Sequence, residues 1–124
     1  NSQRAYVERH GGVFMRGGAE VEGHLDSVGA DAAQIGGAIL LRSSPTTSEV
    51  LEEVHHFQQE QRGDYADLDA TEMRLMREID AQHFLIASAG QYNIPESETA
   101  QTRAALARYQ DELRRWRDGY DQDS

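Results

Sequence analysis

The chain has 124 residues, with 22 acidic against 12 basic side chains, a formal net charge of −10 and no cysteine. This length predicts a single domain over residues 1–124, and the absence of cysteine excludes disulfides, thiolate metal sites and a cysteine nucleophile. The negative field disfavours nucleic acid and anionic membranes as partners, and no apolar run approaches the roughly 20 residues of a membrane span, so we expect a soluble domain.

The first part of the chain, residues 1–44, is rich in glycine and predicts a β-rich region. Segments 5–9 and 13–16 flank Gly11-Gly12, a two-residue turn signal that is typical of a hairpin. We therefore expect these two segments to form an antiparallel pair of strands.

A third strand is predicted over residues 38–42, an apolar run that ends before Pro45. Residues 17–37 are ambiguous: they show short strand character around Val21 and mostly loop character after it. The predicted β-rich region is therefore small.

The second part, residues 45–124, predicts three helices. Ser44 followed by Pro45 indicates an N-cap with proline at the first helical position, so the first helix is expected to run to about Gln61 and to stop at Gly63. Four residues at helical spacing give this helix one apolar face: Val50, Leu51, Val54 and Phe57.

The second helix is expected over residues 69–91, and a cap signal at Asn93-Ile94-Pro95-Glu96 opens a third helix that runs to about Asp118. The inner stripe of the second helix consists of Leu75, Met76, Ile79 and Ile86. The packing seam of the third consists of Leu106, Tyr109, Leu113, Trp116 and Tyr120. The predicted fold class is α+β, with a small N-terminal antiparallel hairpin and strands followed by three helices.

The first predicted helix carries the residues best suited to chemistry. A rotation of about 100° per residue places Glu52 and His56 on one face, one turn apart, with Glu53 rotated towards the apolar stripe. This is the spacing of HExxH, in which residues i and i+4 bind zinc and the glutamate at i+1 is the general base. Here the first ligand would be a carboxylate, which zinc also accepts. The competing interpretation is an acidic solvent-facing helix; His55 points away from the proposed site in either case.

A zinc site needs a third protein ligand. The second predicted helix offers four candidates: Glu72, Glu78, Asp80 and His83. Glu72 and His83 lie near the centre of the apolar stripe, where an ionised group is costly unless it is paired or bound to metal. Glu78 and Asp80 lie on opposite flanks of that stripe. Spacing does not choose among the four, and an ordinary structural role is the competing interpretation for each.

Three segments of the chain resemble the zincin-like metallopeptidase toxin domains found at the C-terminal ends of bacterial polymorphic toxins. They are 48–59 (SEVLEEVHHFQQ), 78–86 (EIDAQHFLI) and 94–99 (IPESET). The resemblance extends over about the last 85 residues. It implies a strand that leads into a helix with HExxH or a variant, and then a helix with an acid that completes the metal site.

Carried over by position, the resemblance implies that Glu52 and His56 are zinc ligands and that Glu53 is the base. It also implies Glu78 as the third ligand, with Asp80 as its rival. Glu52 departs from the family pattern, which has histidine at the first position.

The implied function is a metal-dependent peptidase that is secreted or delivered into a target cell as part of a larger toxin and cleaves a peptide or protein. In this mechanism Glu53 takes a proton from water and passes it to the leaving amine, and strand 38–42, as an edge strand, pairs with the extended substrate. A dedicated immunity protein is the implied partner, and the charge of −10 predicts that its surface is basic. The alternatives are a catalytically inert binding or adaptor domain of the same fold and a different toxin activity on the same scaffold.

Overall fold

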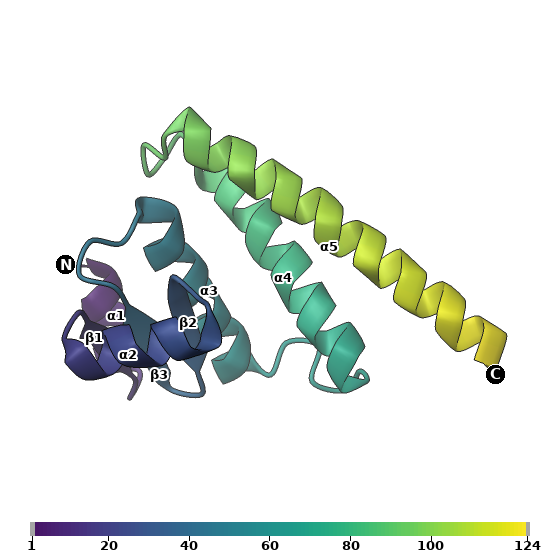
Figure 1. Cartoon of the computed structure of the whole chain (residues 1–124), viewed down its shortest axis with the longest axis horizontal. Helices are drawn as coiled ribbons and strands as arrows, with labels where there is room; N and C mark the ends of the chain where they lie inside the picture. Colours follow the sequence, from purple (N-terminus) through teal and green to yellow (C-terminus); the bar gives the residue numbers. More distant parts are fainter. Residues whose placement is uncertain (1, 124) are drawn as a thin grey trace. The chain divides into compact units, whose positions relative to one another are not determined.

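A computed structural model describes residues 2–123, and the side chains of residues 2–119 (Figure 1). Over this range the chain forms five helices and one three-stranded sheet, which confirms the α+β class. The chain divides into two compact units, one ending at Arg62 and the other beginning at Gly63. The prediction of a single domain over residues 1–124 stays a prediction. None of the described helices combines the length and the apolar character that crossing a membrane requires.

The first unit contains the sheet and three helices. Its elements are α1 (Ser2–Arg9), β1 (Val13–Arg16), α2 (Ala19–Val28), β2 (Ala32–Ile35), β3 (Ala38–Leu41) and α3 (Thr47–Arg62). The strand order is β1-β3-β2, with β1 parallel and β2 antiparallel to β3. The connection from β1 to the parallel β3 passes through α2, as parallel pairing requires a crossover.

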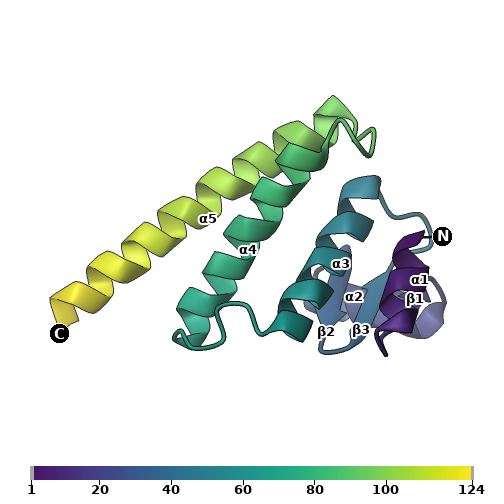
Figure 2. The ribbon, with the colours of Figure 1, turned by 180° about the vertical axis from the view of Figure 1, so that it is seen from behind.

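Alternation of side chains along the strands gives the sheet two apolar faces. On one face α1 and α3 cover the strands, and the buried cluster there consists of Val7, Phe14, Ile39, Leu41, Val54 and Phe57. On the other face α2 covers them, and the buried cluster consists of Val21, Leu25 and Leu40. Figure 1 shows α2 in front of the strands, and Figure 2, from behind, shows α1 and α3 there. The helix that carries the candidate site is therefore fixed by the larger cluster.

The predicted N-terminal hairpin is wrong. Residues 2–9 form α1, and β1 pairs with β3 instead of with the segment before it. The two glycines end a helix: Gly11 has φ +81°, and the amides of Gly11 and Gly12 donate to the carbonyls of Glu8 and Val7. Such backbone bonds from glycines satisfy carbonyls at a helix C-terminus, so a two-glycine signal here marks a helix end.

Residues 17–37, left ambiguous by the sequence, contain α2 and β2, so the predicted strand character around Val21 and the mostly loop character after it were wrong. Val21 and Leu25 are one helical turn apart and both are buried, whereas Gly29, at φ +68°, caps the helix in the left-handed conformation. Gly36, at φ +56°, lies in the turn between β2 and β3.

The position of β3 corrects a further expectation. It is the central strand, paired on both sides, so it cannot add a peptide as an edge strand would. The edge strands of the described sheet are β1 and β2, and β2 packs against α3.

Helix α3 starts later than predicted, at Thr47. Thr46 Oγ1 accepts from the amide of Glu49 at 3.1 Å, and Glu49 Oε1 accepts from the amide of Thr46 at 2.7 Å. This reciprocal pair is a capping box, which displaces Ser44 as the predicted cap. The predicted apolar face is confirmed by the burial of Leu51, Val54 and Phe57.

The second unit consists of α4 (Ala70–Ser88) and α5 (Glu96–Asp123), which pack against each other. Asp69 caps α4 by accepting from the amide of Thr71 at 2.9 Å. The fully buried Leu75 and the largely buried Leu113 lie on the predicted inner stripes of the two helices; Tyr120 lies outside the described side chains. The helices at residues 69–91 and after Pro95 were thus predicted correctly in number and approximate extent.

Of the two candidate ligands that were expected near the centre of the apolar stripe of α4, Glu72 is paired and His83 lies outside the stripe. Glu72 forms an ion pair with Arg117 of α5, with Oε2 2.8 Å from Nε. His83 is exposed, so it does not lie at the centre of a buried stripe. The buried residues of α4 include Leu75, Ala81 and Leu85, so His83 lies outside the packed face of the helix.

Candidate functional site

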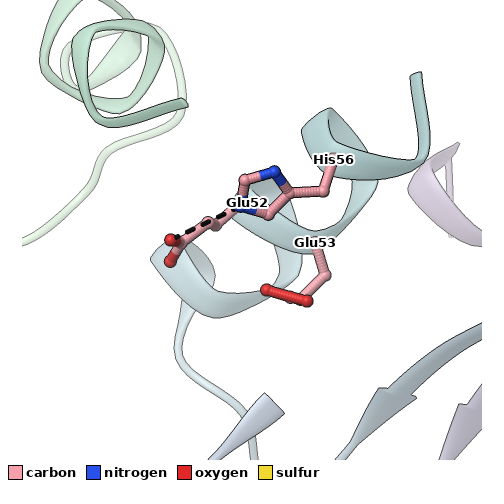
Figure 3. A group of neighbouring side chains, drawn as sticks. All are labelled: Glu52, Glu53 and His56. Carbon is pink, nitrogen blue, oxygen red and sulfur yellow. Dashed lines mark ion pairs between the residues drawn. The ribbon is translucent and has the colours of Figure 1, made fainter. Parts of the chain in front are cut away.

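Helix α3 brings together Glu52, Glu53 and His56. One potential ligand atom from each lies within 4.8 Å of the others. Figure 3 shows Glu52 and His56 one turn apart along one flank of the helix, with Glu53 projecting from the neighbouring flank. The structure thus groups the three residues that HExxH spacing predicted as two ligands and a base.

The three side chains differ in their access to solvent. Glu53 is buried, with 8% of its surface exposed, next to the buried Val54. The side chains of His56 and Glu52 are 11% and 26% exposed. Solvent therefore reaches the cluster from the side of Glu52, whereas Glu53 approaches it from the inner side of the helix.

The imidazole of His56 has a different neighbour on each side. Its Nε2 lies 3.9 Å from Oε1 of Glu52, which is too long for a hydrogen bond. Its Nδ1 lies 2.8 Å from Oε1 of Gln59, a hydrogen-bond distance. Gln59 is fully buried. Sequence reasoning missed Gln59, although its i+3 spacing from His56 on a helix was a usable signal.

The donor set fits a divalent cation. Two carboxylates and one imidazole are ligands that zinc accepts. Two carboxylates this close repel each other, and a cation beside both offsets that repulsion, more strongly where solvent is limited. The cluster therefore has the chemistry for a metal, and a third ligand from elsewhere in the chain would be needed in addition to Glu52 and His56 if Glu53 acts as the base.

The predicted third ligands, Glu78 and Asp80, lie half-buried on α4 in the second unit. Asp80 is one of the charges that act on Tyr65: burial, and next the negative charges of Asp80 and Asp64, raise the pKa of the Tyr65 hydroxyl. Glu78 and Asp80 stay predicted ligands. His55 is half-buried and is not a member of the cluster, as expected.

Comparisons of the chain with protein families, curated proteins and solved structures found no match. The cluster on α3 and the sequence segments around it are therefore what indicates a function. Three features bear on it: the spacing of the three side chains, the burial of Glu53 and the contact of His56 with Gln59.

Proposed function

We propose that the chain is a metal-dependent, peptidase-like toxin domain with a degenerate HExxH motif. In this proposal Glu52 and His56 bind zinc and Glu53 is the general base; Glu78 and Asp80 stay predicted third ligands. The observation that carries it is the convergence of the ligand atoms of Glu52, Glu53 and His56 to within 4.8 Å of one another.

The roles of the side chains follow from their surroundings. Zinc, when bound at such a site, acidifies water and polarises the carbonyl of a peptide. Glu53 takes the proton from the attacking water at its carboxylate and delivers it to the departing amine. Its burial holds the carboxylate beside the ligands and limits competing solvent. An extended peptide would pair with β2, the edge strand that packs against α3.

The metal is tested by elemental analysis of protein purified without a polyhistidine tag. We expect about one zinc per chain in the wild type, loss of metal in His56→Ala, and retention in His55→Ala, the neighbouring histidine outside the cluster. Circular dichroism checks that each variant is folded. A wild-type protein that stays free of metal in excess zinc would contradict the proposal.

The base is tested separately, because ligands and base fail differently when they are removed. Glu53→Gln should keep the metal and lower peptide hydrolysis by about 10²-fold or more. The measurement is turnover of a protein or peptide substrate, compared with the metal content of the same sample. Full activity in Glu53→Gln would refute this mechanism even if the protein contained zinc.

A second candidate function is a catalytically inert binding domain of the same fold. It is supported by exposed apolar side chains on the first unit: Val13, Ile35 and Val28 are 53%, 53% and 57% exposed. The cognate immunity protein that we propose as partner would present a basic surface to this acidic chain, and its association rate would fall as salt rises. If the metal-free protein binds such a partner, and His56→Ala leaves the affinity unchanged, the interpretation as an inert binding domain would be favoured.

A further inference from the structure

The contact between His56 and Gln59 has a consequence for the proton on the imidazole. The two residues lie three positions apart on α3, and Oε1 of Gln59 is 2.8 Å from Nδ1 of His56. Gln59 is fully buried, so packing holds its side chain in place. Water therefore competes little for this hydrogen bond.

An amide oxygen only accepts hydrogen bonds, whereas a neutral imidazole has one donor nitrogen and one acceptor nitrogen. With Oε1 facing Nδ1, the proton of the neutral ring must be on Nδ1. The lone pair is then on Nε2, the nitrogen that faces Glu52 at 3.9 Å. That distance is too long for a hydrogen bond but lies within the span of two zinc–ligand bonds of about 2.0–2.2 Å each.

We propose that Gln59 is a positioning residue that fixes His56 as the Nδ1–H tautomer and so directs the Nε2 lone pair into the cluster with Glu52 and Glu53. The tautomer itself does not need a metal. Its value for metal binding rests on the proposed function, since a ligating histidine must present an unprotonated nitrogen, and a hydrogen bond at the other nitrogen orients the ring.

The opposite orientation of the Gln59 side-chain amide predicts the other tautomer of His56. Rotation of the Gln59 side-chain amide by 180° would place its NH₂ group at Nδ1, which would then accept, and the ring proton would move to Nε2. In that arrangement His56 would present a proton to Glu52 instead of a lone pair, and a cation would first have to displace it.

Nitrogen NMR of the metal-free protein separates the two arrangements, because protonated and unprotonated ring nitrogens have well-separated ¹⁵N shifts. Recorded at a pH where His56 is neutral, long-range ¹H–¹⁵N spectra should show Nδ1 protonated and Nε2 unprotonated. Gln59→Met removes the acceptor at similar volume and should give a mixture of tautomers, whereas Gln59→Glu should restore the Nδ1–H form. Gln58→Met, on the same helix, is the matched control and should leave the spectrum unchanged.

Zinc affinity measured by calorimetry gives an independent readout: Gln59→Met should weaken binding by about 10–100-fold, and Gln59→Glu should recover most of it. Nε2–H as the main tautomer of the wild type would overturn the inference, and the wild-type spectrum decides this even if Gln59→Met does not fold. A wild type with the Nδ1–H tautomer that fails to bind zinc would refute the proposed function while leaving the role of Gln59 intact.

Discussion

The two compact units differ in what they bury. In the first unit helices cover both faces of a sheet, and most of the buried side chains are aliphatic or aromatic, with Glu53 and Gln59 of α3 as polar exceptions. In the second unit two helices pack on each other, and several of the buried side chains are polar: Gln82, Ser88, Thr99 and Thr102. The first unit is therefore stabilised by apolar packing. The same packing holds α3, the helix that carries the candidate site.

The second unit has several ion pairs, most of them exposed. They join Glu72 to Arg117, Arg74 to Glu112, Arg103 to Glu96, and Asp111 to both Arg114 and Arg115. Exposed pairs of this kind contribute about 0.2–1 kcal/mol each and weaken as salt rises. The first unit also has ion pairs, of Arg4 with Glu8 and of Arg42 with Glu22, Asp26 and Asp31. The comparison therefore predicts that cavities destabilise the first unit more than the second, whereas salt weakens exposed ion pairs in both.

The largest expected effect is that of Phe57→Ala. Phe57 is fully buried, contacts Tyr6 edge-on at a centroid distance of 6.4 Å, and belongs to the cluster under α3. Truncating such a side chain costs about 3–5 kcal/mol. Urea unfolding measures the loss, and hydrogen exchange should show it in the amides of β3 and α3. A loss below about 1 kcal/mol would mean that this cluster is not what stabilises the first unit.

Gly12→Ala tests the same packing by adding an atom. A Cβ at Gly12 would lie 2.5 Å from Cε2 of Phe57 and 2.7 Å from Cγ1 of Val7. Overpacking of this kind costs about 1–3 kcal/mol, and thermal unfolding measures it. Gly37→Ala is the control, since its Cβ would meet nothing within 4 Å. Equal stability of the two variants would show that the close approach of Gly12 is not needed.

Local signals predicted part of this architecture. The apolar face of α3 and the grouping of Glu52, Glu53 and His56 depend only on the rotation per residue within one helix, so the sequence contained both. Gln59 obeys the same rule, three residues after His56, but it is uncharged and lies outside the HExxH pattern, so that pattern did not predict its role.

Non-local pairing was not predicted. β1 pairs in parallel with β3, which lies more than twenty residues later in the chain, and no local pattern distinguishes this from a hairpin across Gly11-Gly12. The third ligand was left open for a related reason: Glu78 and Asp80 lie on a different helix, and periodicity gives a face but no distance to a cluster elsewhere. The start of α3 was predictable in principle, because Thr46 and Glu49 have capping-box spacing.

Thr46→Ala tests that cap. Loss of the Oγ1 acceptor for the amide of Glu49 should cost about 1 kcal/mol, and the first turn of α3 should exchange its amides faster. Thr47→Ala is the matched control, because Thr47 is exposed inside the helix and alanine favours helix there. If the two variants have the same stability, the reciprocal bonds contribute nothing measurable.

The smallest expected effect compares one ion pair from each unit. In the first unit Arg42 reaches Glu22 at 2.6 Å and Asp26 at 2.9 Å and donates to the carbonyl of Ala30, and these carboxylates raise its pKa. In the second, Arg117 pairs with Glu72 at 2.8 Å. Bonds to several acceptors hold the guanidinium of Arg42 in one geometry. The side-chain entropy lost in ordering Arg42 is therefore shared among several contacts, whereas Arg117 loses it for one ion pair.

Double-mutant cycles with Arg42→Met and Glu22→Gln, and with Arg117→Met and Glu72→Gln, measure the two coupling energies in low and high salt. The coupling of Arg117 with Glu72 should lie in the range of about 0.2–1 kcal/mol and fall as salt screens it. That of Arg42 with Glu22 should be larger and fall by a smaller fraction, because the side chain of Arg42 is less exposed than that of Arg117, and Glu22 also accepts from the amide of Ser43 at 3.1 Å. Equal couplings with equal salt dependence would contradict the contrast between the units, since charge would then stabilise the sheet-containing unit no differently from the helical one.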